Sequence, residues 1–231
     1  RTRKPHIKTY EEERELTMML VVDVSGSRLF GTTDRLKKNM MTEIAAVLAF
    51  SAAQNNDKIG CLFFSDRVEK FIPPKKGRSH VLTIIRELIE FMPERRTTDV
   101  GEALRFLTNV TKKRCTTFVL SDFFDTEDGK ARFDDALKIA SDKHDLVGIR
   151  IYDPREAELP DVGAVELLDA ETGRKVWGDT SSPAVRRAYG EHWLRTSSVI
   201  EDTLKHSRVD HVTVATDEDY VAALMKLFKQ R

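Results

Sequence analysis

The chain has 231 residues, and its 38 lysines and arginines balance 38 aspartates and glutamates. This length suits one large α/β domain better than two small ones, and a net charge of zero gives no field that favours nucleic acid or a membrane surface. Every apolar run is shorter than the roughly 20 residues that span a bilayer, and the charged start RTRKPHIK lacks the apolar core of a signal peptide. We therefore expect a cytoplasmic protein without a nucleic-acid partner or a membrane span in this chain.

The expected domain organisation is simple. Residue 1 is arginine rather than methionine, so we expect residues 1–16 to be an N-terminal arm at the end of a truncated upstream region. Residues 17–231 are expected to form a single domain, because the sequence contains no internal repeat, low-complexity segment or convincing linker.

Short β-branched or aromatic runs alternate along the chain with longer helical segments, which is typical of a parallel sheet covered on both faces. The short runs predict strands over residues 17–24, 58–64, 115–121, 146–151, 164–168 and 211–215. A central, mostly buried helix is expected between the first two strands, from a cap at Asp34 to its end at Asn55. The other predicted helices cover residues 79–91, 100–110, 131–143, 183–205 and 218–229.

Two segments depart from this alternation. SDRVEKFIPPKKG, after the second strand, predicts a short antiparallel edge strand, because its prolines cannot donate to a ladder. Thr172 and Gly173 stand at a plausible hairpin tip, and we expect this hairpin to extend the edge of the sheet. The predicted fold class is therefore α/β, a doubly wound, mostly parallel, Rossmann-like sheet with one antiparallel edge strand and a small hairpin extension.

Oxygen-bearing side chains follow two of the predicted strands where each strand ends. VVDVSGS places Asp23, Ser25 and Ser27 after the first strand, and VLSDF places Asp122 after the third. Thr98, in RTTDVGEAL, immediately precedes a predicted helix. Ligands of doubly wound sheets gather beyond the carboxyl ends of the strands. Carboxylates and hydroxyls without thiols or clustered imidazoles suit Mg²⁺ or Mn²⁺ and disfavour zinc.

A simpler interpretation exists for each hydroxyl taken alone. Ser25, Ser27 and Thr98 are all residue types that cap helices, because they accept hydrogen bonds from unpaired amides. Asp99 is better explained as support for its loop or for the dipole of the following helix than as a metal ligand. The metal interpretation depends on the combination of the hydroxyls with two strand-end acids.

This combination resembles the three-part metal-ion-dependent adhesion site (MIDAS) of von Willebrand factor A domains, through DVSGS, Thr98 and Asp122. A closer similarity is to the bacterial domain of unknown function DUF58. It is carried by YEEERELTMMLVVDVSGS, NNDKIGCLFFSDRVEKFIPPKKGRSHVL and HDLVGIRIYDPREAELPDVG. The resemblance covers nearly the whole chain and implies a von Willebrand factor A-like fold. Members of the DUF58 family commonly accompany MoxR-type AAA+ ATPases.

The resemblance also implies roles for individual residues. Ser25 and Ser27 would bind the metal through their hydroxyls, with Thr98 as the third protein ligand, directly or through water. Asp23 and Asp122 would mostly orient waters and the serines. One open position would receive a Glu or Asp from a protein partner. Arg28 departs from the family pattern, which usually has methionine there, and this cation could pair with the partner's acid or compete with the metal.

The resulting hypothesis is a Mg²⁺-dependent (or Mn²⁺-dependent) protein-interaction module, not an enzyme. The resemblance suggests an adaptor that partners a MoxR-type AAA+ ATPase in protein maturation, complex assembly or metal-cofactor insertion. The alternative is a metal-dependent phosphoryl-transfer enzyme, since phosphatases of the haloacid dehalogenase type carry a nucleophilic aspartate at the end of the first strand. Those enzymes need a second acid two residues later for proton transfer, and Ser25 stands at that position.

Overall fold

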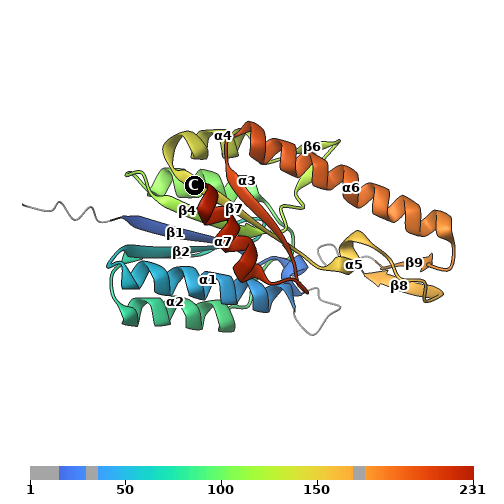
Figure 1. Cartoon of the computed structure of the whole chain (residues 1–231), viewed down its shortest axis with the longest axis horizontal. Helices are drawn as coiled ribbons and strands as arrows, with labels where there is room; N and C mark the ends of the chain where they lie inside the picture. Colours follow the sequence, from blue (N-terminus) through green and yellow to red (C-terminus); the bar gives the residue numbers. More distant parts are fainter. Residues whose placement is uncertain (1–15, 30–35, 169–174) are drawn as a thin grey trace, which may run out of the picture.

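A six-stranded sheet forms the centre of the molecule (Figure 1). The computed structural model describes residues 16–29, 36–168 and 175–231. The strands of the sheet, in spatial order, are β3 (Val68–Lys75), β2 (Lys58–Phe64), β1 (Thr17–Asp23), β4 (Thr116–Ser121), β7 (Asp145–Tyr152) and β10 (Asp210–Ala215). Every neighbouring pair is parallel except β2 with β3. Counted within this sheet, the order is the 3-2-1-4-5-6 arrangement of doubly wound proteins.

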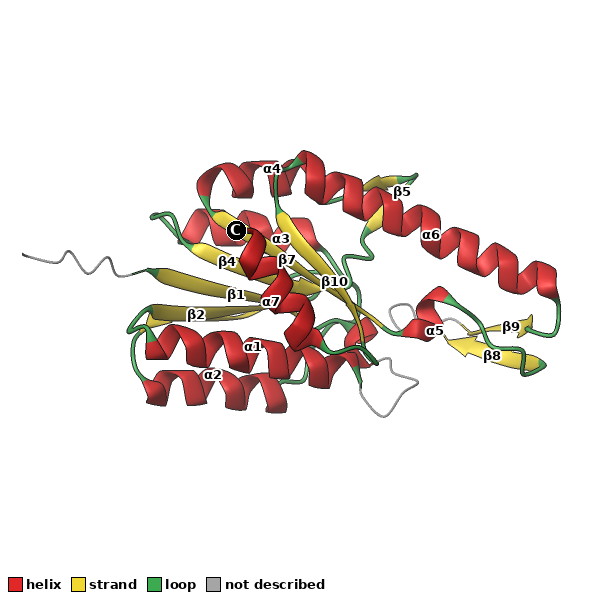
Figure 2. Ribbon diagram, viewed as in Figure 1, coloured by secondary structure: helices red, strands yellow, loops and turns green. Residues whose placement is uncertain are grey.

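Helices cover both faces of the sheet (Figure 2). One face is packed by α1 (Lys37–Gln54), α2 (Arg78–Glu90) and α7 (Tyr220–Gln230). The other is packed by α3 (Val100–Val110), α4 (Asp134–Lys143) and α6 (Pro183–His206). Successive residues of β1 point to opposite faces, so Leu20 and Val22 belong to the first core cluster and Met19 and Val21 to the second. Burial on both faces explains why this strand is continuously apolar.

The fold class expected from the sequence is confirmed: the sheet is doubly wound and mostly parallel, with the antiparallel edge strand β3. The expected position of the hairpin is wrong. Strands β8 (Ala164–Leu168) and β9 (Lys175–Asp179) form a separate two-stranded sheet, because β10 already pairs with the free edge of β7. The short helix α5 (Pro154–Ala157) carries the chain away from that edge, and the hairpin lies beyond the sheet, near the first half of α6 (Figure 1).

Most element boundaries agree with the predicted ones to within a few residues. Helix α1 begins at Lys37, after an N-cap position occupied by Leu36. It is buried along the side that carries Met40 and Ile44, whereas Val47 is half exposed. Helix α4 begins three residues later than predicted because a small hairpin, β5 (Thr126–Glu127) with β6 (Lys130–Ala131), precedes it.

Some expectations fall on residues that the structure does not describe. The proposed helix cap Asp34 and the hairpin tip at Thr172 and Gly173 lie outside the described ranges, as do residues 1–15 of the expected N-terminal arm. The division at residue 17 therefore stays a prediction. Within the described ranges, no helix is both long enough and apolar enough to cross a membrane.

Candidate metal centre

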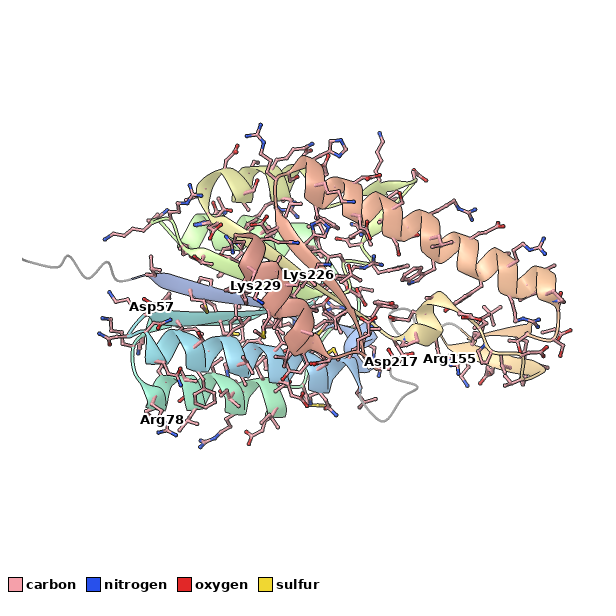
Figure 3. The ribbon with its side chains drawn as sticks, viewed as in Figure 1. Asp57, Arg78, Arg155, Asp217, Lys226 and Lys229 are labelled. Atoms are coloured by element: carbon pink, nitrogen blue, oxygen red, sulfur yellow. The ribbon has the colours of Figure 1, made fainter. Side chains whose placement is uncertain are left out.

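The candidate site lies at the carboxyl ends of β1 and β4, which are neighbours in the middle of the sheet. The chain leaves β1 toward β2 on one side, whereas β4 leads to β7 on the other, so the site is at the topological switch point where doubly wound folds bind ligands. Figure 3 marks the two ends of the sheet: Asp57 precedes β2 at one end, and Asp217, which follows β10, lies at the other with Arg155 of α5.

Asp23 is the last residue of β1 and is fully buried. Its Oδ1 accepts a hydrogen bond from the Ser25 amide at 2.9 Å, and its Oδ2 accepts one from Ser121 Oγ at 2.6 Å. Both of these hydrogen-bond donors, the Ser25 amide and the Ser121 hydroxyl, are uncharged. Burial, and then the negative charge of Asp122, raise the pKa of Asp23 to about 6. A cation near Asp23 would therefore relieve an unfavourable buried charge.

Ser25 and Ser27 place two hydroxyl oxygens next to each other, with 3.1 Å between the two Oγ atoms. Adjacent ligands of an octahedral Mg²⁺, each about 2.0–2.1 Å from the ion, are about 2.9 Å apart. Ser25 also donates a hydrogen bond to Asp23, and Ser27 donates one to Asp122. Donation to these acids turns the hydroxyl protons away from the oxygen lone pairs that would face a cation. The serine pair therefore fits a small, hard cation.

Thr98 belongs to the loop between α2 and α3, and backbone hydrogen bonds hold this loop against the serine segment. The Gly26 amide donates to the Arg96 carbonyl at 2.7 Å, and the Asp99 amide donates to the Ser65 carbonyl, after β2, at 2.9 Å. The side chain of Thr98 is buried, with 6% exposed. Asp99 caps α3 by accepting a hydrogen bond from the Glu102 amide at 2.7 Å, which confirms its predicted supporting role.

Asp122 follows β4, and other groups already engage its carboxylate. The Phe124 amide donates to Oδ1 at 3.1 Å, and Lys37 Nζ donates to Oδ2 at 2.8 Å. Arg150 Nε also donates to the backbone carbonyl of Asp122 at 3.1 Å. Burial alone would raise the pKa of Asp122, but Lys37 holds it below its ordinary value. The carboxylate is thus fixed in its ionised form, where it can orient Ser27 and waters.

Lys37 is one of two residues of the site that sequence reasoning missed; the other is Ser121, which donates to Asp23. It stands in the first turn of α1, with 0% of its surface exposed, and its Nζ donates both to Asp122 and to Glu156 Oε1 at 2.6 Å. Burial would lower the pKa of Lys37, but the two acids raise it above its ordinary value. A signal was available, since Lys37 precedes Met40 and Met41 by three and four residues and so lies on the apolar stripe of the helix.

The groups available to a metal are mainly hydroxyl oxygens, and the neighbouring acids accept hydrogen bonds from the serine hydroxyls. In keeping with this, the described part of the chain contains no group of three or more His, Cys, Asp or Glu side chains that could hold a metal. The structure brings the segment of Ser25 and Ser27 together with Asp23, Asp122 and the loop of Thr98. The side chain of Arg28, the departure noted in the sequence, lies outside the described part of the structure.

The sequence matches one protein-family model and several bacterial relatives. The family model described as "Protein of unknown function DUF58" matches residues 1–198. Over 234 aligned residues the chain is 29% identical to uncharacterized proteins of Mycobacterium bovis and Mycobacterium tuberculosis. These alignments cover all of this chain and 72% of each relative.

Solved structures share the fold at lower sequence identity. The conserved hypothetical protein BatB from Bacteroides thetaiotaomicron has a TM-score of 0.60 at 16% identity, over 93% of this chain and 98% of that one. An aerotolerance-related membrane protein from Bacteroides fragilis has the same TM-score and identity, over 93% of this chain and 99% of that one. At this identity the similarity shows the fold alone.

Proposed function

Since the chain belongs to the DUF58 family and has a von Willebrand factor A-like fold, we propose that it is a metal-dependent protein-interaction module. The observation that carries this proposal is the pair of serine hydroxyls, 3.1 Å apart, each donating to a buried acid at the switch point of the sheet. A hydroxyl pair of this spacing fits an octahedral cation such as Mg²⁺ or Mn²⁺.

Each residue would have a distinct task. Ser25, Ser27 and Thr98 would hold the ion through hydroxyl oxygens, while Asp23 and Asp122 orient the serines and supply negative charge. A bound dication supplies an electrophilic position for an oxygen ligand. A Glu or Asp side chain of a partner protein is suited to that position, because it brings a donor oxygen and a compensating charge together.

The arrangement of Asp23 favours binding over phosphoryl transfer. Both of its carboxylate oxygens accept hydrogen bonds, and the side chain is fully buried, so neither oxygen is presented as a nucleophile. The position two residues later, where a phosphatase of this architecture needs a proton donor, carries Ser25. Part of the proposal is therefore that the chain itself is not an enzyme. Hydrolysis of a phosphate monoester by the purified chain, lost in Asp23→Asn, would overturn it.

The metal assignment is tested by thermal unfolding with and without Mg²⁺ or Mn²⁺. At a metal concentration about 100 times the dissociation constant, binding adds about 2.7 kcal/mol, which raises the Tm of a chain of this length by about 5–10 °C. Ser25→Ala should remove the shift, whereas Ser198→Ala, at an exposed position in α6, should keep it. Equal shifts in the two variants would refute the site.

The finer proposal is that the module is an adaptor for a MoxR-type AAA+ ATPase, in protein maturation, complex assembly or metal-cofactor insertion. This part rests on what accompanies other members of the family. The test is binding of a purified MoxR-type ATPase from the same organism, measured in Mg²⁺ and in EDTA. Thr98→Ala should lose the Mg²⁺-dependent binding, and Thr83→Ala, at an exposed threonine of α2, should retain it. Binding that is equally strong in EDTA would contradict a metal-dependent contact.

A further inference from the structure

A buried ammonium group stands directly behind the candidate metal centre. Lys37 Nζ lies 2.8 Å from Asp122 Oδ2 and 2.6 Å from Glu156 Oε1, and the whole side chain is shielded from solvent. Cations are rarely buried so completely unless acids pair with them. Next to a metal centre such a cation also has an electrostatic effect, since it repels the metal that the neighbouring acids attract.

Lys37 is held in place by three parts of the fold. Its backbone belongs to α1, Asp122 follows β4, and Glu156 belongs to α5. Glu156 is itself fixed, because its Oε2 accepts a hydrogen bond from the Asp153 amide at 2.9 Å in a capping box. The Lys37 ammonium therefore cannot swing into solvent without breaking two ion pairs, the one with Asp122 buried and the one with Glu156 partly exposed.

Among the described side chains, the charges in contact with the acids of the site can be counted. Ionised Asp23 and Asp122 together with the Lys37 ammonium carry one net negative charge. Glu156, which contacts Lys37, and Arg150, which contacts the Asp122 carbonyl, carry opposite charges that cancel in this count. A dication would therefore leave the site with one excess positive charge. Without Lys37 the same ion would be neutralised by the two acids alone.

We propose that Lys37 is a specificity-determining residue of the metal site, whose fixed positive charge makes the occupied site require an anionic ligand. Binding of the metal and of a partner carboxylate is then cooperative, because each charge compensates the other. The ligand class that fits is a monoanionic carboxylate, as in an Asp or Glu side chain, rather than a neutral amide or hydroxyl. This inference rests on the proposed function and adds the electrostatic reason for the choice of ligand.

Two substitutions with opposite expected effects test the inference. Lys37→Met keeps the alkyl chain and removes the charge, so Mn²⁺ should bind about tenfold more tightly or better, as measured by isothermal titration calorimetry. Glu156→Gln leaves Lys37 and its bond to Asp122 in place but removes a negative charge, so Mn²⁺ should bind several-fold more weakly. A purely structural role of the ion pairs would weaken binding in both variants.

The anion requirement is measured with acetate as the probe. In the unmodified chain, Mn²⁺ affinity should rise when acetate replaces chloride at equal ionic strength, and this gain should shrink in Lys37→Met. Lys138→Met is the matched control, because it removes an ammonium from the exposed pair with Asp134 and should leave both measurements unchanged.

The outcomes separate the two proposals. Failure of the unmodified chain to bind Mn²⁺ or Mg²⁺ would refute the metal site itself, and the inference with it. If the unmodified chain binds Mn²⁺ but Lys37→Met binds equally or more weakly, the inference about Lys37 is wrong and the metal site stands. Should Lys37→Met fail to fold, Glu156→Gln decides, since unchanged or tighter Mn²⁺ binding in that variant would overturn the inference.

Discussion

Replacing Asp23 by asparagine is expected to stabilise the metal-free protein, although Asp23 is a central residue of the site. Burial and Asp122 raise the pKa of Asp23 from an ordinary value of 3.8 to about 6. A difference of about 2 pKa units at about 1.4 kcal/mol each means that ionising Asp23 costs the folded state about 3 kcal/mol at neutral pH. Asparagine avoids this cost and weakens the hydrogen bonds with Ser25 and Ser121, a loss of about 1 kcal/mol.

The net gain for Asp23→Asn is about 2 kcal/mol, or about 4–8 °C in Tm for a chain of this length. The pH dependence of this stability difference follows from the raised pKa of Asp23 in the folded state. A carboxyl whose folded pKa is raised destabilises the folded state above that pKa, and the effect disappears below the unfolded pKa. The advantage of the variant should therefore be full above pH about 6 and vanish as the pH falls toward about 4.

The assay is urea and thermal unfolding in EDTA across this pH range, repeated with Mg²⁺. With Mg²⁺ the order should reverse, because only the unmodified chain gains stability from the ion. Asp134→Asn, an exposed acid of α4, is the matched control and should change stability little at any pH. A variant that is less stable than the unmodified chain in EDTA at neutral pH would refute the reasoning, because it would mean that a favourable partner already compensates the Asp23 charge.

Two further predictions concern the core of the fold. His144 is fully buried, and burial, followed by the charges of Lys143 and Arg114, lowers its pKa below the ordinary value of 6.5. The free energy of unfolding should therefore fall as the pH drops below 6.5, because only the unfolded chain then takes up the proton. His144→Phe should flatten this pH dependence in urea unfolding, and an unchanged slope would contradict the prediction. Gly60 lies in β2 where a Cβ would come within 2.7 Å of Met19 Sδ and 2.9 Å of the Ile72 carbonyl oxygen, so Gly60→Ala should cost about 2 kcal/mol or more in chemical denaturation. Gly190→Ala, in α6, serves as the control for crowding, since the nearest atom to its Cβ position is the Ala157 carbonyl oxygen at 3.6 Å, an ordinary van der Waals contact, and an equal loss there would count against the steric explanation.

The candidate site differs in one important respect from the site that the sequence suggested. Sequence reasoning identified Arg28 as the neighbouring cation, because it directly follows the serines. The structure places Lys37 against Asp122, with a second acid, Glu156, more than 100 residues away in the sequence. Ser121, which donates to Asp23, was also missed because it was assigned only as the end of a strand.

The sequence by itself was sufficient to predict the alternation of strands and helices and the antiparallel edge strand, and it supplied the candidate ligands, which stay a prediction. These features depend on local periodicity and on short motifs at strand ends, such as DVSGS and LSDF. Each of them can be recognised within a single segment of the sequence. The parallel order of the central strands then dictates that the ends of β1 and β4 meet, so the strand pattern and the two motifs were enough to assign Asp23 and Asp122 to one site.

Only the tertiary structure decided which charges balance that site and where the hairpin lies. The pairing of Lys37 with Asp122 and Glu156 depends on how α1, β4 and α5 pack together, and no local pattern encodes such a contact across the fold. The hairpin of β8 and β9 stands apart because β10, much later in the chain, takes the edge of β7. Both outcomes depend on contacts between segments that are far apart in the sequence, and such contacts are decided only when the whole chain packs.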